Sequence, residues 1–142
     1  MKKLLFGLLS LTLLATACKK DKDAPAVTKD NITGTYKVMS IKAWVNGTSV
    51  PDADDRQDCE KDDLIKLNAD NSYAYQDAGT VCDPAGDVAG TWALNESSKV
   101  ITTDDGEISG TITSFDGTNM DVTIEGTEGG ISYKIVTTFK KQ

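Results

Sequence analysis

Hydrophobic and polar residues alternate in short runs along most of the chain, and this pattern indicates β-strands. From Thr33 onward there is no helical period, and the runs are separated by Gly, Asp and Asn turn signals. The alternation is clearest in the last run, which places Ile131, Tyr133 and Ile135 on one face. The runs predict eight strands, at Thr35 to Val45, Leu64 to Leu67, Ser72 to Gln76, Thr91 to Leu94, Val100 to Thr103, Ile108 to Ser114, Asn119 to Glu125 and Ile131 to Phe139.

Two turn sequences predict how neighbouring strands pair. Residues 69–72 and 115–118 each suit a type I turn followed by a left-handed residue, Asn71 or Gly117, which is the three-residue hairpin loop with a bulge. A two-residue loop would shift the pairing by one residue and place apolar residues on opposite faces. The longer loop predicts the pairs Leu67 with Tyr73, Ile65 with Tyr75, Ile112 with Met120 and Ile108 with Ile124.

The N-terminal segment has the pattern of a bacterial lipoprotein signal. Lys2 and Lys3 supply positive charge, residues 4–14 form an apolar run, and residues 15–17 are small residues that precede Cys18. The apolar run is too short to span a bilayer. We therefore expect a signal peptide at residues 1–17 and a flexible, Lys- and Asp-rich tether at residues 18–31.

Cys18 is the predicted site of lipidation. Of the three cysteines, Cys59 and Cys82 can pair within the folded region, and thioether acylation accounts for the third. An ordinary secretory signal cut at the same bond is the alternative, because Ala15 stands where lipoprotein signals usually have Leu. Acylation would make the membrane a partner of this chain through its N-terminal lipid.

Cys59 and Cys82 are predicted to form a disulfide. Extension of the first hairpin places residue 82 opposite residue 58, so the two cysteines lie about one position from facing each other. Export makes the compartment oxidising. A zinc site is disfavoured because the chain has no histidine to complete it, and a nucleophilic cysteine would lack an imidazole partner.

The charge of the chain excludes nucleic acid as a partner. Loss of Lys2 and Lys3 with the signal peptide lowers the basic count from 15 to 13 against 22 acidic residues, so the formal charge changes from −7 to −9. Such a chain repels phosphate backbones. Arg56 is the only arginine, so clustered guanidinium recognition is not available.

Several short motifs lie in order along the chain. Gly-Thr-Tyr at 34–36 is followed by segments 58–62 and 67–73, Cys82, Gly-Thr-Trp at 90–92 and segment 112–114. Gly-Thr-Tyr resembles the Gly-x-Trp start of lipocalins, and the order of the motifs resembles that of the lipocalin-like domain lipoproteins of Gram-negative, Bacteroidota-type bacteria. The resemblance covers residues 30–142. It implies one all-β domain at residues 32–142, folded as an eight-stranded antiparallel up-and-down barrel, and it implies no reaction.

The residues that follow Cys18 bear on location. Residues 19–23 resemble the sorting region of lipoproteins exported to the outer membrane, and a plain soluble spacer is the alternative interpretation. We therefore expect a lipid anchor in the cell envelope, at the outer membrane of a Gram-negative bacterium, on its periplasmic or its surface-exposed face.

Two classes of function remain open. In the first, a small apolar ligand binds in or at the mouth of a small barrel. In the second, the barrel is solid, and the loops at 46–63 and 79–89 contact a surface protein or glycan, as in an adhesin, an inhibitor or an accessory subunit. Both loops are expected at one barrel end. The candidate ligand-lining residues are Ile65, Leu67, Tyr73, Tyr75, Trp92 and Ile135.

No catalytic residue, cofactor or metal site is predicted, and the chain is expected not to be an enzyme. The acidic clusters lie in loops, where no apolar pocket is evident to raise the pKa of a carboxyl group. The acidic loop 52–63 offers oxygen atoms to calcium, but Arg56 and Gln57 occupy positions where the EF-hand needs a ligand and a glycine. A solvated, charge-dense loop is the favoured interpretation.

Overall fold

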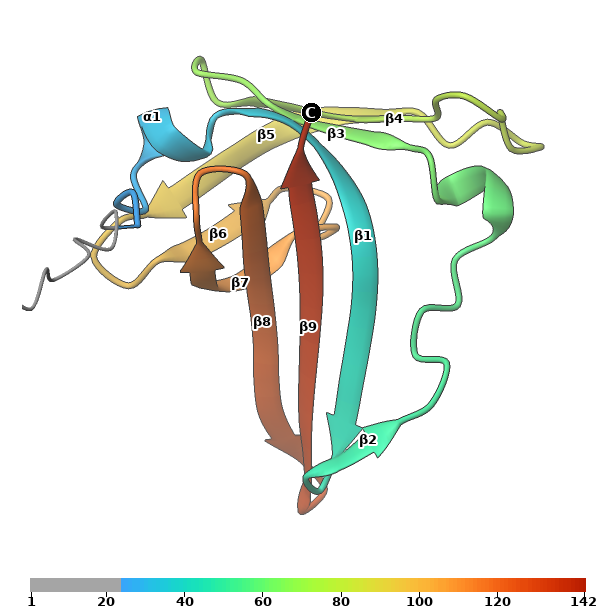
Figure 1. Cartoon of the computed structure of the whole chain (residues 1–142), viewed down its shortest axis with the longest axis vertical. Coiled ribbons are helices and arrows are strands. Elements are labelled where there is room, and N and C mark those ends of the chain that lie inside the picture. The colour runs from blue at the N-terminus through green and yellow to red at the C-terminus, as the bar shows by residue number, and fades with distance from the viewer. Residues whose placement is uncertain (1–23) are drawn as a thin grey trace, which may run out of the picture.

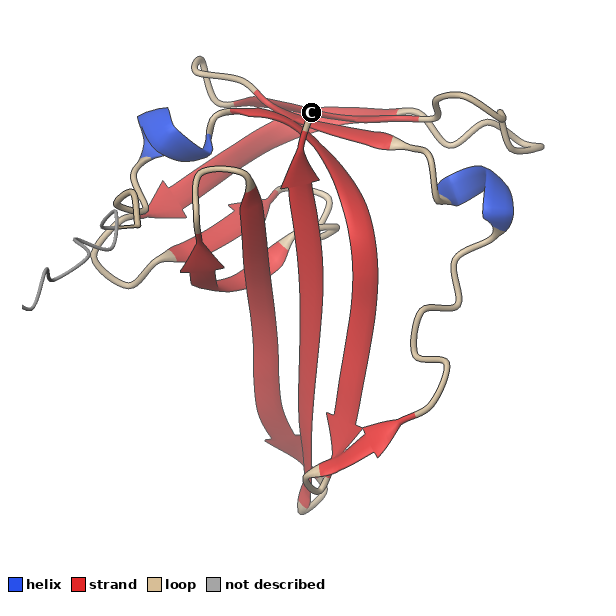
Figure 2. Ribbon diagram, viewed as in Figure 1, coloured by secondary structure: helices blue, strands red, loops and turns tan. Residues whose placement is uncertain are grey.

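The computed structural model describes residues 24–142, and almost all of its regular structure is β-sheet (Figures 1 and 2). The predicted signal peptide, residues 1–17, and the predicted lipidation site, Cys18, lie outside the described residues. The elements are α1 (Lys29–Ile32), β1 (Gly34–Val45), β2 (Thr48–Val50), the 3₁₀ helix η1 (Asp58–Glu60), β3 (Leu64–Leu67), β4 (Ser72–Gln76), β5 (Val88–Asn95), β6 (Val100–Thr103), β7 (Ser109–Phe115), β8 (Asn119–Glu128) and β9 (Ile131–Lys141).

The strands form one antiparallel sheet that closes on itself. The sheet order is β2-β1-β3-β4-β5-β6-β7-β8-β9, and β1 also pairs with β9. This pairing closes β1 and β3 to β9 into an eight-stranded up-and-down barrel, while β2 pairs with the far end of β1. The all-β, eight-stranded antiparallel barrel predicted from the sequence is confirmed.

β2 was not predicted, although its turn has a clear sequence signal. Asn46 and Gly47 both have positive φ angles, 48° and 78°, and they connect Val45 to its pairing partner Thr48. An Asn-Gly pair suits a two-residue hairpin turn because both residues tolerate positive φ. β1 therefore folds back briefly before the chain enters the long loop to β3 (Figure 1).

The predicted pairing of the first hairpin is confirmed. Leu67 pairs with Tyr73 and Ile65 with Tyr75 across β3 and β4. Asn71 has a φ of 71°, so it occupies the left-handed position of the three-residue loop. The Ser72 carbonyl accepts a bond from the Asn68 N–H at 2.9 Å, which closes the loop.

The predicted pairing of the second hairpin was wrong. Ile112 pairs with Val122, and Phe115 is the residue that pairs with Met120. The Asp116 carboxylate accepts bonds from the N–H groups of Thr118 and Asn119, at 2.8 and 2.6 Å, and this tightens the turn. A bulge between Ile112 and Ser114 then shifts the register again. Ile108 precedes β7, and Ile124 pairs with Ile135 of β9 instead.

The apolar core fills the end of the barrel where the chain enters β1 and leaves β9. We call this the closed end, and the opposite end the mouth. Ile32 of α1 and Tyr36 of β1 are fully buried, and the Tyr36 hydroxyl donates to the Ile32 carbonyl at 2.7 Å. The Trp92 indole N–H donates to the Asn68 carbonyl at 2.9 Å. The other members of the buried cluster are Ile65, Leu67, Tyr73, Ile101, Ile108, Ile112, Phe115, Met120, Val122 and Phe139.

Part of the predicted tether lies against the closed end. Val27 packs on the core, and the Thr28 side chain accepts a bond from the Asn31 N–H at the start of α1. The Lys141 ammonium donates to the Asn31 carbonyl at 3.1 Å. The described chain therefore begins beside the closed end and not beside the mouth.

β1, β8 and β9 extend well beyond the other strands and form a three-stranded ribbon (Figure 1). β8 pairs with β7 only up to Thr123, whereas its pairing with β9 continues to Glu128. β1 likewise pairs with β3 only as far as Tyr36. The ribbon therefore projects from the mouth and exposes both of its faces.

Candidate ligand-binding site

A cavity of about 560 Å³ opens at the mouth, on the side of the filled core that faces away from the closed end. Small-molecule sites are commonly clefts of this order of volume. β1 and β9 form one wall, β3 to β5 form another, and the loop that contains η1 borders the opening. The apolar and aromatic residues of the lining are Val38, Ile41, Ile65, Tyr75, Val88 and Phe139.

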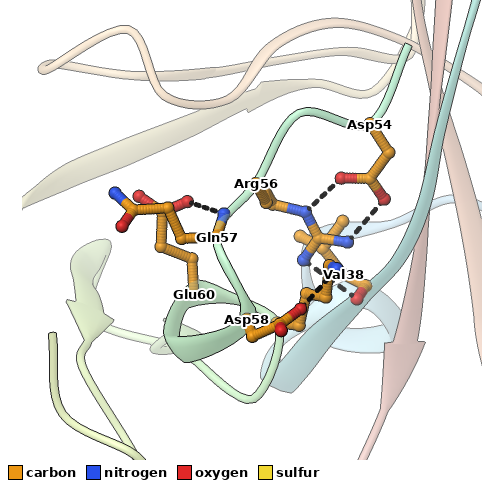
Figure 3. Close-up of polar contacts among 7 residues, drawn as sticks. Val38, Asp54, Arg56, Gln57, Asp58 and Glu60 are labelled. Atoms are coloured by element: carbon orange, nitrogen blue, oxygen red, sulfur yellow. Dashed lines mark hydrogen bonds and ion pairs between the residues drawn. The ribbon is translucent and has the colours of Figure 1, made fainter. Parts of the chain in front are cut away.

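Arg56 fixes the η1 loop against the barrel wall (Figure 3). Its Nε and Nη2 atoms donate to the two oxygens of Asp54, at 2.9 and 2.8 Å, and Nη1 donates to the Val38 carbonyl at 3.3 Å. The hydrogen bonds from Arg56 lower the pKa of Asp54, and the same contact raises the pKa of Arg56. The guanidinium charge is therefore already neutralised by a bidentate carboxylate.

The η1 segment is held by its own side chains and by a disulfide. The Gln57 N–H donates to the Glu60 carboxylate at 2.6 Å (Figure 3). Lys61 pairs with Asp58 at 2.8 Å. Cys59 and Cys82 form a disulfide with a Cα–Cα distance of 5.4 Å, which confirms the predicted bridge. The bridge joins the two long loops of the mouth.

Asp63 and Tyr75 form a buried polar pair in the cavity wall. Asp63 is only 6% exposed, and its two oxygens accept bonds from the Tyr75 hydroxyl at 2.6 Å and the Ala78 N–H at 3.0 Å. Burial raises the pKa of Tyr75, and the hydrogen bond to Asp63 raises it further. Tyr75 therefore remains a neutral donor at physiological pH, directed at a carboxylate.

Other acidic side chains accept hydrogen bonds from the backbone of the neighbouring loop, residues 77–87. The Asp77 carboxylate accepts bonds from the N–H groups of Cys82 and Gly86, and Asp62 accepts one from Thr80 at 3.0 Å. Part of the acidic content of the mouth thus serves to satisfy the backbone of an irregular segment.

The six predicted lining residues are placed at different depths. Ile65 and Tyr75 line the cavity. Leu67, Tyr73 and Trp92 are buried in the core below it. Ile135 lies on the ribbon and pairs with Ala43 and Ile124.

Four apolar residues of the cavity wall were not predicted from the sequence: Val38, Ile41, Val88 and Phe139. The alternation in β1 and β9 is a signal that could have found Val38 and Phe139, which pair with each other. It could not show that these strands face the start of β5, because this depends on closure of the barrel.

The inner face of the ribbon continues the apolar surface of the cavity. Ile41 and Thr137 line the cavity, and alternation along the strands puts the residues that follow on the same face. Five apolar residues of this face are 36–51% exposed: Val45, Val50, Ile124, Ile131 and Tyr133. On the outer face, a second, open hollow of about 610 Å³ surrounds Trp44, Lys134 and Val136.

Residues 24–142 show neither a metal cluster nor a membrane-spanning helix. In that range, no three or more Cys, Asp or Glu side chains are grouped so that they could hold a metal ion. The helices described there are too short to cross a bilayer.

Comparison with known families gives a clear result. A family model for the lipocalin-like domain matches residues 32–122, which is more than half of the chain. This protein belongs to the lipocalin-like domain family. No curated protein and no solved structure matches the chain. Eight-stranded barrels of this kind are filled by side chains or hold one small ligand, so membership suggests ligand binding or another non-catalytic role.

Proposed function

We propose that this protein is a membrane-anchored, non-catalytic lipoprotein that binds one small apolar ligand at the mouth of its barrel. The observation that carries the proposal is the cavity of about 560 Å³ above a filled core. Six of its fourteen lining residues are apolar or aromatic and seven are polar or charged, so apolar surface and polar groups meet in one site, as in small-molecule sites. Because the closed end is filled by the core, a ligand can occupy only the mouth end of the barrel.

The anchoring part of the proposal rests on the signal pattern that ends at Cys18. Up-and-down connectivity puts the start of β1 at the closed end and the loops 46–63 and 77–87 at the mouth. An anchor that precedes residue 24 therefore joins the barrel at its closed end. We propose that the protein is anchored in the outer membrane of a Gram-negative cell. The mouth then points away from the membrane surface.

The non-catalytic part rests on the side chains of the cavity. The chain has no histidine, and the described lining contains no serine or cysteine, so the usual nucleophile and base pairs are missing there. The carboxylate with the least exposure, Asp63, already accepts two hydrogen bonds. Binding is therefore favoured over turnover.

The test is a titration with N-phenyl-1-naphthylamine, a neutral apolar fluorescent probe. Val88 lines the mouth and is 40% exposed, so Val88→Trp is expected to fill the opening and weaken binding at least about tenfold. The matched control is Val81→Trp, because Val81 is 61% exposed and lies outside the cavity lining.

We expect saturable binding by the unmodified protein and by Val81→Trp. Absence of binding by the unmodified protein, or equal loss in both variants, would contradict a ligand site at the mouth. The urea midpoints of the two variants show whether each one is folded.

A second candidate function is a cell-surface interaction protein with a solid barrel and functional loops. The exposed apolar face of the ribbon favours it, because a contiguous apolar patch often marks a docking surface. The disulfide-linked loops border the same end of the molecule. Failure of the probe to bind would make this candidate the stronger one.

A further inference from the structure

We propose that the ligand of the mouth cavity is a cationic amphiphile, an apolar body that carries a protonated amine. This inference rests on the proposed ligand-binding function and specifies the chemistry of its site. It depends on three features of the mouth: the charges that face the cavity, a buried carboxylate without a cation, and an apolar surface that leads out of the cavity.

The charges that face the cavity are unbalanced. Four carboxylates line it, those of Asp55, Glu60, Asp63 and Glu107, and Arg56 is the only cation among the described lining residues. Arg56 forms its ion pair with Asp54, at 2.8 Å, and with none of the four, although its charge also acts on Glu60. Neither the Asp55 nor the Glu107 side chain accepts a hydrogen bond from any described residue. A cation that enters the cavity therefore meets uncompensated negative charge.

Asp63 is the strongest single indication. It is 6% exposed in the cavity wall, and among residues 24–142 no Lys or Arg side chain lies within ion-pair distance of it. Buried carboxylates are usually paired with a cation, because neutral donors compensate only part of the loss of hydration. The Tyr75 ring also lines the cavity and donates to Asp63. A carboxylate beside an aromatic ring is the chemistry that recognises an ammonium group.

The rest of the mouth strengthens this local field. The loops 46–63, 77–87 and 104–107 carry seven, three and three acidic residues, and their two basic residues, Arg56 and Lys61, are both in ion pairs. The loops of the closed end, 68–71, 96–99 and 116–118, carry one acidic residue each. A concave site bordered by one sign of charge concentrates ligands of the opposite sign and speeds their association.

An apolar body has a surface to occupy. From Ile41 and Thr137 the cavity wall continues onto the inner face of the ribbon, where Ile124 and Tyr133 are exposed. A ligand with its amine at Asp63 would therefore bury its apolar part against this wall. An anionic amphiphile would need Arg56, whose fork is already occupied by Asp54 and by the Val38 carbonyl.

The experiment compares three ligands that share one alkyl chain, decylamine, decanol and decanoate. Each displaces N-phenyl-1-naphthylamine from the full protein at neutral pH, below the concentration at which it forms micelles. We expect decylamine to bind at least about tenfold tighter than decanol at low salt, and decanoate to bind more weakly than decanol. The advantage of the amine should shrink as salt is added, because salt screens the exposed carboxylates.

Two variants locate the effect. Asp63→Asn is expected to remove most of the preference for decylamine over decanol while decanol binding is retained. Glu107→Gln changes a side chain that accepts no described hydrogen bond, so it keeps the test valid if Asp63→Asn fails to fold. The matched control is Asp30→Asn, which removes one charge beside the closed end and should leave the preference unchanged.

The outcomes separate the inference from the function on which it rests. If decanol and decylamine bind equally, or if decanoate binds tightest, the cationic preference is overturned while ligand binding stands. If none of the three displaces the probe, both proposals fall. A preference that survives in Asp63→Asn and in Glu107→Gln would also overturn the assignment.

Discussion

Tyr36 seals the closed end of the barrel with both its ring and its hydroxyl. The side chain is fully buried, the hydroxyl donates to the Ile32 carbonyl at 2.7 Å, and the Lys141 ammonium lies 5.9 Å from the ring centroid. Burial raises the pKa of Tyr36 from 10.0 to about 12. The folded state therefore holds this proton at pH values where the unfolded chain releases it.

This proton predicts a loss of stability in alkaline solution. The contribution of Tyr36 is full below pH 10 and is lost as the pH rises from 10 toward 12, because the unfolded state then binds fewer protons than the folded state. We expect the free energy of unfolding to fall by ~2 kcal/mol across this interval from Tyr36 alone. Urea unfolding at a series of pH values measures it.

Tyr36→Phe is the comparison for this measurement. It should reduce the alkaline slope and cost about 1 kcal/mol at neutral pH, since the hydrogen bond to Ile32 is lost. The remaining slope belongs to Tyr73 and Tyr75, whose pKa values burial also raises. An alkaline slope that is the same with and without the Tyr36 hydroxyl would contradict this account.

At the scale of elements, the turn residues decide how the strands of each hairpin pair. In the β3–β4 hairpin, Asp70 accepts a bond from the Ser72 N–H at 2.9 Å and Asn71 adopts the left-handed conformation, so the turn sets the register. In the β7–β8 hairpin, the capping by Asp116 and a bulge change the register. In the mouth, residues 51–63 and 77–87 are held instead by side-chain hydrogen bonds and by the disulfide.

The disulfide that joins the mouth loops should stabilise the folded protein. It closes a loop with a sequence separation of 23 residues, so replacement of Cys59 and Cys82 by Ala should cost about 3 kcal/mol in the chain-entropy model. Urea unfolding measures the loss, and circular dichroism should show that the β-sheet is retained. Reduction of the unmodified protein should reproduce the loss and should have no effect on the double variant. Equal stability of the two oxidised proteins would contradict the prediction.

At the scale of the whole molecule, the two barrel ends differ in packing, charge and connection to the N-terminus. The closed end is filled, begins beside α1, and has loops with few charges. The mouth holds the cavity, the acidic loops and the exposed ribbon. This arrangement suits a binding domain that is attached at one end and open at the other.

Attachment is tested by the chemistry of Cys18. We expect the mature protein to begin at Cys18, to carry the mass of a diacylglyceryl group, and to partition into detergent, since two or more acyl chains anchor stably and one alone is marginal. Intact mass and detergent phase separation measure this. Cys18→Ser should abolish both signals, and an unmodified mass in the soluble fraction of the unaltered protein would disprove lipidation.

Many strands of the barrel could be predicted from the sequence, because alternation and turn residues are local signals. Alternation located β3, β4 and β6 at their observed bounds, and turn chemistry set the β3–β4 register. The same register brought Cys59 close to Cys82, and the bridge is present. Within the cavity wall, Ile65 and Tyr75 were predicted because they lie on the apolar face of that hairpin.

The remaining features depend on contacts between distant segments. Pairing of β1 with β9 closes the barrel and brings Val38 and Phe139 into the same wall. The shift in β7–β8 depends on a bulge and on one carboxylate cap, which alternation alone does not show. The burial of Asp63 is likewise a tertiary effect. The sequence of an acidic loop predicts a solvated carboxylate, and only the folded structure shows that Asp63 is buried. Local patterns thus decide which residues form strands, and only closure of the sheet decides which side chains share a cavity.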